Sequence, residues 1–179
     1  MSRHVHAGSG FVSQLVSWGL LAAWICVIWG HSLMPGTQSS LESGYVLGLV
    51  QKAGAWLVMQ DYPPITRLLA EHPGILTVLG DSSLLHYYVR KAGHFSEYFM
   101  LAILAFNAVR TTFAHPLASA AIFGGIWYFV PNIDETIQRY VPGRASMTSD
   151  VLLDMCGFAC GFALCLVCAG ITSLFRHDS

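Results

Sequence analysis

Two long apolar runs, residues 11–29 and 151–175, constrain the fold of this chain more than any other feature. A helix needs about 20 mostly apolar residues to cross the hydrocarbon core of a bilayer. Charged residues make up 11% of the 179 residues and hydrophobic residues 54%, whereas a typical soluble domain has about 25% and about 45–50%. These charged residues are too few to cover the water-exposed surface of a soluble domain of this size. The sequence therefore predicts an integral membrane protein with membrane lipid as a partner.

The composition also excludes other classes of protein. The formal net charge is -1 and no basic patch is present, so no nucleic-acid partner is expected. A chain this apolar is not intrinsically disordered. The five cysteines show neither the paired spacing of a zinc site nor a secreted disulfide framework, so they are expected to pack as small apolar residues.

Four runs are predicted to cross the membrane, at residues 11–29, 93–109, 117–133 and 151–175. The first could instead be a signal peptide, but it ends in Trp29-Gly30-His31-Ser32 and lacks a small-residue cleavage site. The second can begin earlier, because Asp81 and the two serines after it offer N-caps. Pro131 should kink or end the third, and Thr148 or Ser149 should cap the fourth.

The segment between the first two spans, residues 31–90, is expected to be a long loop. Proline, glycine and serines over residues 35–43 indicate irregular structure. Residues 44–59 are apolar but short and interrupted by Gln51 and Lys52, which favours an interfacial or re-entrant helix. The predicted fold is therefore all-α. It is one domain over residues 1–179, a polytopic membrane bundle of about four transmembrane helices plus one or two interfacial or re-entrant helices in the first loop.

One group of polar residues lies at the start of the second span. Lys91, His94, Glu97 and Tyr98 recur at steps of three and four residues, so they share one helix face. A charge at the centre of a spanning helix costs roughly 2.5–3.5 kcal/mol, and such residues usually mark a site. For Lys91 alone, an interfacial side chain that reaches toward the headgroups explains the position equally well.

A second group follows the third span. Asp134 and Gln138 share one helix face, and Glu135 and Arg139 the next. A turn at Pro142-Gly143 should send Arg144 back toward the bundle.

Two further aspartates lie at the start of the fourth span. Asp150 alone could complement a helix dipole. Asp154, one turn deeper, needs a partner, and Arg139 or Arg144 is the expected one.

Helix counting places both groups at the same membrane face. They can therefore converge into one polar pocket formed by Lys91, His94, Glu97, Tyr98, Asp134, Glu135, Gln138, Arg139, Arg144, Asp150 and Asp154. A structural ion-pair network could use the same residues. Gly157 and Gly161 form a GxxxG step, which permits close association of helices, although the two glycines could also merely fill space.

These polar blocks resemble the VanZ-like family of membrane proteins. Residues 91–98 are similar to the family's K-x-x-H-F-x-E-Y pattern. Residues 134–144 are similar to D-E-x-x-Q-x-x-x-P-G-R, and the following D-x-x-x-D and glycine stand at 150, 154 and 157. Ser32 and the serines at 39 and 40 are a weaker similarity to the family. The resemblance implies a multi-pass protein of the bacterial cytoplasmic (inner) membrane, in a family whose founding member is associated with resistance to the glycopeptide teicoplanin.

Three functions remain open. The pocket could bind or process an anionic cell-envelope component, such as a lipid phosphate or sugar-lipid, with arginines holding oxygens and His94, Glu97, Asp134 or Glu135 serving as acid or base. The protein could instead be a non-enzymatic envelope or resistance factor, or a small proton-coupled transporter. The sequence assigns no reaction. Carboxylates would suit Mg²⁺ or Ca²⁺. The cationic side chains of the same pocket explain the carboxylates equally well, so neither a metal nor another cofactor is predicted.

Overall fold

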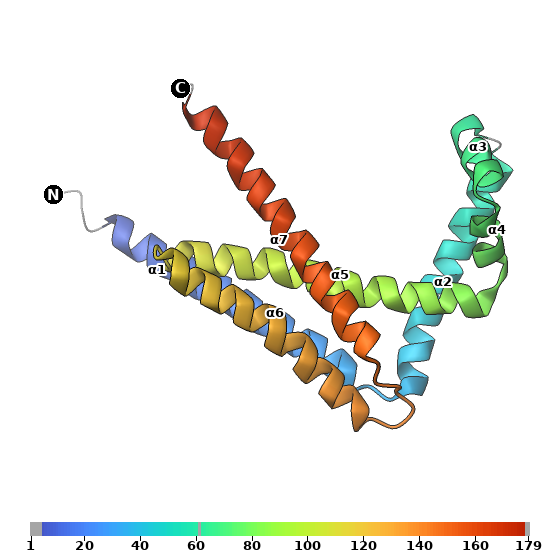
Figure 1. Ribbon diagram of the computed structural model, residues 1–179, viewed down its shortest axis with the longest axis horizontal. Coiled ribbons are helices and arrows are strands. Elements are labelled where there is room, and N and C mark those ends of the chain that lie inside the picture. Colours follow the sequence, from blue (N-terminus) through green and yellow to red (C-terminus); the bar gives the residue numbers. More distant parts are fainter. Residues whose placement is uncertain (1–4, 61, 178–179) are drawn as a thin grey trace. The chain divides into compact units, whose positions relative to one another are not determined.

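The computed structural model describes residues 5–60 and 62–177, and all regular elements in these ranges are α-helices (Figure 1). The seven helices are α1 (Val5–Leu33), α2 (Gly36–Met59), α3 (Pro63–Glu71), α4 (Pro73–Gly80), α5 (Ser82–Thr112), α6 (Pro116–Arg139) and α7 (Thr148–His177). The prediction of an all-helical chain is therefore confirmed for the described residues.

Within residues 5–60 and 62–177, three segments are long and apolar enough to cross a membrane: Gly10–Leu33 in α1, Pro116–Arg139 in α6 and Thr148–Ser173 in α7. They contain the predicted first and third spans and nearly all of the fourth. The predicted second span lies within α5. This helix is not among the three, and it carries two charged residues, Arg90 and Lys91, next to each other as well as Glu97 and Arg110.

Prolines and an aspartate mark where several helices begin. α3, α4 and α6 each have a proline in the first turn, where its missing N–H costs no hydrogen bond. Before α5, Asp81 Oδ1 accepts the N–H groups of Ser83 at 2.8 Å and Leu84 at 3.2 Å. A hydrogen bond from the Ser83 hydroxyl, together with these two from backbone N–H groups, holds the pKa of the Asp81 carboxyl below its usual range. The predicted early start of this helix is confirmed.

The prediction of irregular structure over residues 35–43 was wrong, because α2 begins at Gly36. Pro35 directly precedes the helix, a position where proline does not disturb it. The hydroxyls of Ser40 and Ser43 donate to the carbonyls of Gly36 and Ser39, four residues back. The serines therefore complete their hydrogen bonds within the helix and do not break it.

Two other boundaries differ in detail from the sequence-based expectation. α6 continues to Arg139, so Pro131 does not end the helix, and both Pro131 and its neighbour Val130 are buried. Thr148 is the first residue of α7 and not its cap.

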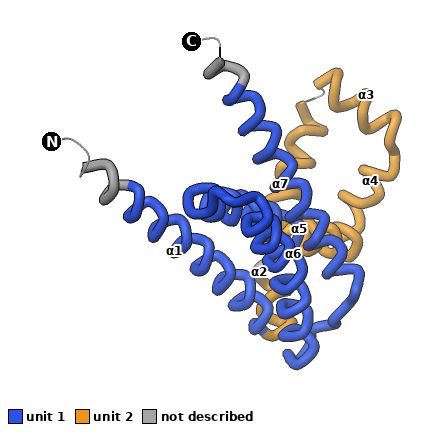
Figure 2. Tube along the Cα trace, turned by 60° about the vertical axis from the view of Figure 1, so that its left-hand side comes forward, with its two compact units in different colours: residues 1–34, 94–179 blue, residues 35–93 orange. Residues whose placement is uncertain are grey.

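The chain forms two compact units (Figure 2). Unit 1 comprises residues 1–34 and 94–179, and within it α6 packs against both α1 and α7. Unit 2 comprises residues 35–93, and within it α3 contacts α2 and α4. α5 contributes its first part to unit 2 and its second part to unit 1. That residues 1–179 are a single domain stays a prediction.

The core of unit 1 draws on all four of its helices. Its buried side chains are Leu21, Ile28, Tyr98, Leu101, Ala102, Ala105, Ala108, Val130 and Phe158. On α7, a Cβ added to Gly157 would lie 2.5 Å from the carbonyl oxygen of Phe95, and one added to Gly161 would overlap that of Phe99. The GxxxG step therefore lets α7 approach the backbone of α5 within the same chain.

Hydrogen bonds between side chains also join α1 to α5. Trp18 Nε1 donates to Thr112 Oγ1 at 2.9 Å, and Asn107 Nδ2 donates to Ser17 Oγ at 2.9 Å. Such bonds hold helices together in a membrane, where apolar side chains gain little from burial against one another.

Candidate functional site

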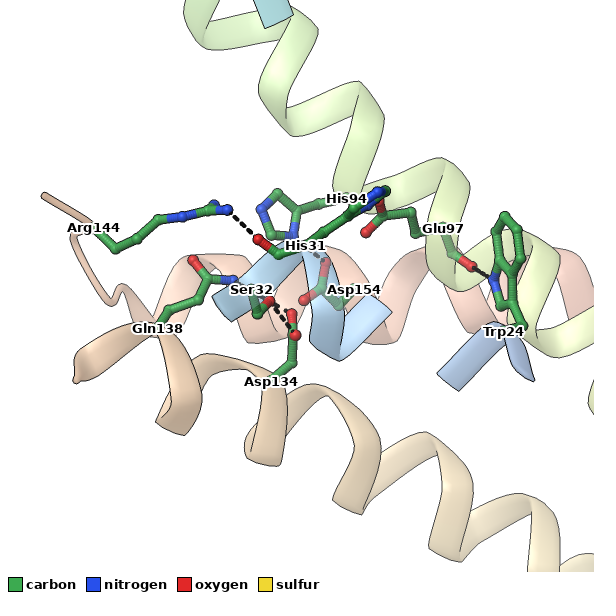
Figure 3. A network of polar contacts seen from close by, with 9 residues as sticks. All are labelled: Trp24, His31, Ser32, His94, Glu97, Asp134, Gln138, Arg144 and Asp154. Carbon is green, nitrogen blue, oxygen red and sulfur yellow. Dashed lines mark hydrogen bonds and ion pairs between the residues drawn. The ribbon is translucent and has the colours of Figure 1, made fainter. Parts of the chain in front are cut away.

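Unit 1 gathers polar side chains at one place, shown in Figure 3. They come from the last turn of α1, the middle of α5, the C-terminal part of α6, the loop after it and the second turn of α7. We call this set the polar cluster: His31, Ser32, His94, Glu97, Asp134, Gln138, Arg144 and Asp154.

Asp134 is fully buried and held in place by hydrogen bonds. Its side chain is 0% exposed. The Ser32 hydroxyl donates to Oδ1, and Gln138 Nε2 donates to Oδ2 at 3.3 Å (Figure 3). Gln138 Nε2 also lies 3.3 Å from Ser32 Oγ, to which it donates. α1 and α6 therefore fix the orientation of this carboxylate together.

Asp154 is equally buried but bonded differently. Its side chain is 0% exposed, and neither carboxylate oxygen accepts a hydrogen bond from the described residues. His94 Nδ1 lies 3.4 Å from Asp154 Oδ1, within ion-pair range but too long for a good hydrogen bond. The buried aspartate was expected to pair with Arg139 or Arg144, yet the structure places a histidine from α5 beside it.

A second histidine–carboxylate pair lies nearer the surface. His31 Nδ1 is 2.7 Å from Glu97 Oε1, and the two side chains are 46% and 21% exposed. Trp24 Nε1 donates to the backbone carbonyl of Glu97 at 2.9 Å, which ties α1 to the same turn of α5. The polar cluster thus runs from an exposed pair to a buried one.

Arg144 lies half-buried at the end of α1. Gly143, with φ of 76°, makes the turn that returns the chain, as the sequence predicts. Arg144 Nη2 donates to the His31 carbonyl at 2.5 Å, and Nε donates to the Met34 carbonyl at 3.1 Å. Arg144 therefore donates to carbonyl groups at the C-terminal end of α1 that have no partner within the helix, and its positive charge complements the helix dipole.

Glu135 and Asp150, both predicted for the pocket, are buried beside the polar cluster. Glu135 Oε1 accepts the backbone N–H of Met147, which connects α6 to the residue before α7. Asp150 accepts a hydrogen bond of 3.2 Å from the Ser149 hydroxyl. Glu135 therefore links the two helices, whereas this bond of Asp150 lies within α7.

The remaining predicted residues take different positions. Tyr98 is 0% exposed in the core, where its hydroxyl lies near Asp134 without forming a well-aligned hydrogen bond. Arg139 is exposed at the end of α6. Lys91 belongs to unit 2, where its Nζ lies 5.3 Å from the centre of the Tyr87 ring.

Sequence reasoning missed His31 and gave Ser32 too little weight. Both lie at the end of the first predicted span, and counting four predicted spans puts that end at the same predicted membrane face as Asp134 and Asp154. Applied to the first span as well, the same counting would have found them. The role of Trp24 carried no such signal, because its bond goes to a backbone carbonyl.

Three residues of the polar cluster have the chemistry of metal ligands. One ligand atom each from His94, Asp134 and Asp154 lies within 4.8 Å of the others. Imidazole nitrogen and carboxylate oxygen are common ligands of divalent transition metals.

An apolar groove of about 220 Å³ lies between α6 and α7. It is lined by Phe123, Gly124 and Trp127 of α6 and by Phe158, Ala159 and Phe162 of α7. No polar side chain contributes to this lining.

Comparison with known proteins gave one match. Residues 17–169 match the protein family described as VanZ/LLP1, which is most of the chain. Comparison with curated proteins and with solved structures found no match.

Proposed function

The chain belongs to the VanZ/LLP1 family, and three helices in its described part are able to cross a membrane. From this premise we propose that it binds a lipid-linked component of the cell envelope. The polar cluster would hold an anionic headgroup, such as a lipid phosphate or a phosphate-bearing sugar. The proposal places this function in the cytoplasmic membrane of a bacterium, as the family resemblance implies.

The observation that carries the proposal is that the apolar groove and the buried aspartates share two helices. Phe158 of the groove lies four residues, about one turn, after Asp154 on α7. Trp127 lies seven residues before Asp134 on α6, about 10 Å along the helix at 1.5 Å per residue. A lipid has a polar headgroup and an acyl chain at a similar spacing, so the headgroup would lie at the polar cluster and the acyl chain in the apolar groove.

The composition of the polar cluster supports an anionic, hydroxyl-bearing headgroup. Arg144, which also donates to the Met34 and His31 carbonyls, and the His31 ring are adjacent cationic or proton-donating groups near the exposed end. Arginine is a common partner of phosphate oxygens. Glu97 next to them can accept hydrogen bonds from sugar hydroxyls.

We also propose that α5 is a fourth spanning helix and that α2, α3 and α4 are interfacial or re-entrant. α5 has 31 residues, about 46 Å at 1.5 Å per residue, which exceeds the thickness of the hydrocarbon core. Its buried residues Leu101, Ala102, Ala105 and Ala108 belong to the same core as the membrane-capable helices. The short helices α3 and α4 cannot cross a bilayer.

The test is native mass spectrometry of the purified protein, with identification of any bound lipid. The full chain should carry a phosphate-bearing lipid. Arg144→Gln should reduce the bound fraction at least about tenfold, since a charge-assisted contact is worth about 1.5–3 kcal/mol.

Arg139→Gln is the matched control, because it removes the same charge from an exposed position on a neighbouring segment. Thermal unfolding of each variant separates lost binding from lost folding. Equal lipid loss in both variants, or no phosphate-bearing lipid on the full chain, would contradict the proposal.

Proton transfer is a second proposed function, supported by the order of the two histidine–carboxylate pairs. His31–Glu97 is partly exposed, whereas His94 and Asp154 are 13% and 0% exposed. Such chains of titratable groups serve as proton relays in membrane proteins. Proteoliposomes containing the chain should then show a proton flux that Glu97→Gln abolishes, and a flux equal to that of empty liposomes would rule this out.

A further inference from the structure

We propose that His94, Asp134 and Asp154 form a binding site for one divalent transition-metal cation. The site lies inside unit 1, where α5, α6 and α7 meet. It goes beyond lipid binding, because it requires only these three side chains and no envelope ligand.

The burial of two carboxylates is the first argument. Asp134 and Asp154 are both 0% exposed, and their ligand atoms lie within 4.8 Å of each other. Burying one ionised carboxylate is costly without compensation, and two close together also repel each other. A divalent cation balances both charges, whereas a protonated His94 would balance one.

The unused hydrogen-bonding capacity of Asp154 is the second argument. Both of its oxygens and the Nδ1 atom of His94 are buried, and none of these three atoms has a hydrogen-bond partner among the described residues. Buried polar atoms nearly always have a partner. His94 Nδ1 lies 3.4 Å from Asp154 Oδ1, so the two unbonded groups are close enough to bind one ion between them.

Asp134 provides the third argument, because it has the supporting bonds typical of a metal ligand. The Ser32 hydroxyl and Gln138 Nε2 donate to its two oxygens, and each oxygen keeps a lone pair for a cation. Outer hydrogen bonds of this kind orient ligating carboxylates, and their loss typically weakens metal binding about 10- to 100-fold.

The ligand set indicates the class of metal. One imidazole nitrogen with two carboxylates suits Mn²⁺, Zn²⁺ or a similar ion, whereas Mg²⁺ and Ca²⁺ prefer all-oxygen sites. Mn²⁺ is the better probe for this chain, because thiolates bind it weakly and α7 carries Cys156, Cys160 and Cys168 as exposed free thiols.

The experiment is Mn²⁺ titration of the full, chelator-treated protein in detergent, followed by the electron paramagnetic resonance signal of free Mn²⁺. We expect about one Mn²⁺ per chain. Asp154→Asn should weaken binding at least about tenfold, and Ser32→Ala about 10- to 100-fold. Asp150→Asn, which neutralises a buried carboxylate one turn away on the same helix but outside the ligand set, should weaken binding much less than Asp154→Asn.

The unaltered protein also carries a test that needs no variant. Co²⁺ bound to the chelator-treated chain should give the weak visible bands of a nitrogen- and oxygen-ligated ion, without the strong sulfur-to-cobalt charge-transfer absorption that binding to the exposed cysteines would produce. Absence of stoichiometric Mn²⁺ binding, absence of that spectrum, or equal Mn²⁺ affinity in Asp154→Asn and the parent would each overturn the proposal. If no phosphate-bearing lipid is bound while Mn²⁺ binds as expected, the metal site is supported and the proposed lipid binding is refuted.

Discussion

At the scale of single residues, the decisive contact is the hydrogen bond from Ser32 to Asp134. It joins α1 to α6 inside the bundle, between two fully or nearly fully buried groups. In such surroundings a hydrogen bond to a charged group is strong, and an unpaired carboxylate is costly. Ser32 therefore determines whether Asp134 keeps one orientation.

Ser32→Ala should lower the free energy of unfolding by about 1.5–3 kcal/mol, because a buried carboxylate loses a charge-assisted donor. Denaturant-induced unfolding in detergent measures this. Ser40→Ala is the control, since that exposed hydroxyl only bonds the carbonyl of Gly36 in its own helix. Equal effects of the two substitutions would mean that the Ser32 bond has no special role.

At the scale of elements, α7 depends on glycine for its distance from α5. Gly157 and Gly161 are buried against the backbone of Phe95 and Phe99, whereas an added Cβ at Gly170 meets nothing within 4 Å. Because Asp154 lies one turn before this contact, the close approach of the helices also sets the position of the buried pair with His94.

Gly161→Ala should therefore destabilise the protein by about 1–3 kcal/mol, the usual cost of overpacking a tight contact. Gly170→Ala, on the same helix, should be neutral or slightly stabilising, since alanine favours helix over glycine. Thermal unfolding of the two variants makes the comparison. A tolerated Gly161→Ala would show that α7 and α5 do not approach as closely as described.

The start of α5 depends on pH through Asp81. The pKa of this carboxyl is lowered in the folded chain by its hydrogen bonds with Ser83 and Leu84, so the folded state binds its proton less readily than the unfolded state. The stabilisation is present above the ordinary aspartate pKa of about 3.9 and is lost as pH falls through the lowered value.

Amide hydrogen exchange at Ser83 and Leu84 measures this effect, after correction for the intrinsic pH dependence of exchange. Protection should decrease as pH falls below about 4. Asp81→Asn should keep a capping acceptor but remove the pH dependence, and Asp81→Ala should lose protection at every pH. Unchanged protection in Asp81→Ala would refute the capping role.

At the scale of the whole molecule, the sequence predicted helices more reliably than their roles. Run length and polarity predicted four spans, and three of these coincide with membrane-capable helices among the described residues, because bilayer thickness fixes the length of an apolar helix. They failed at residues 35–43, where serines bond within α2. They also failed to identify His94 as the neighbour of Asp154, because helical periodicity does not determine which faces of separate helices meet.

The number of membrane crossings can be tested through the ends of the chain. Four crossings place both termini on the same side, whereas the three segments of sufficient hydropathy would place them on opposite sides. Protease protection of N-terminal and C-terminal tags in oriented vesicles should therefore show both tags cleaved or both protected. One tag cleaved and the other protected would exclude α5 as a spanning helix.

The central claim is that polar residues far apart in sequence form one site inside the unit 1 bundle. A double-mutant cycle of His94→Gln and Asp154→Asn tests it most directly, using unfolding free energies in detergent. The account predicts a coupling energy of about 0.5–3 kcal/mol for this pair. For His94→Gln with Thr172→Ala, 18 residues further along α7, it predicts additivity within about 0.3–0.5 kcal/mol. Additive effects for His94 and Asp154 as well would contradict the claim.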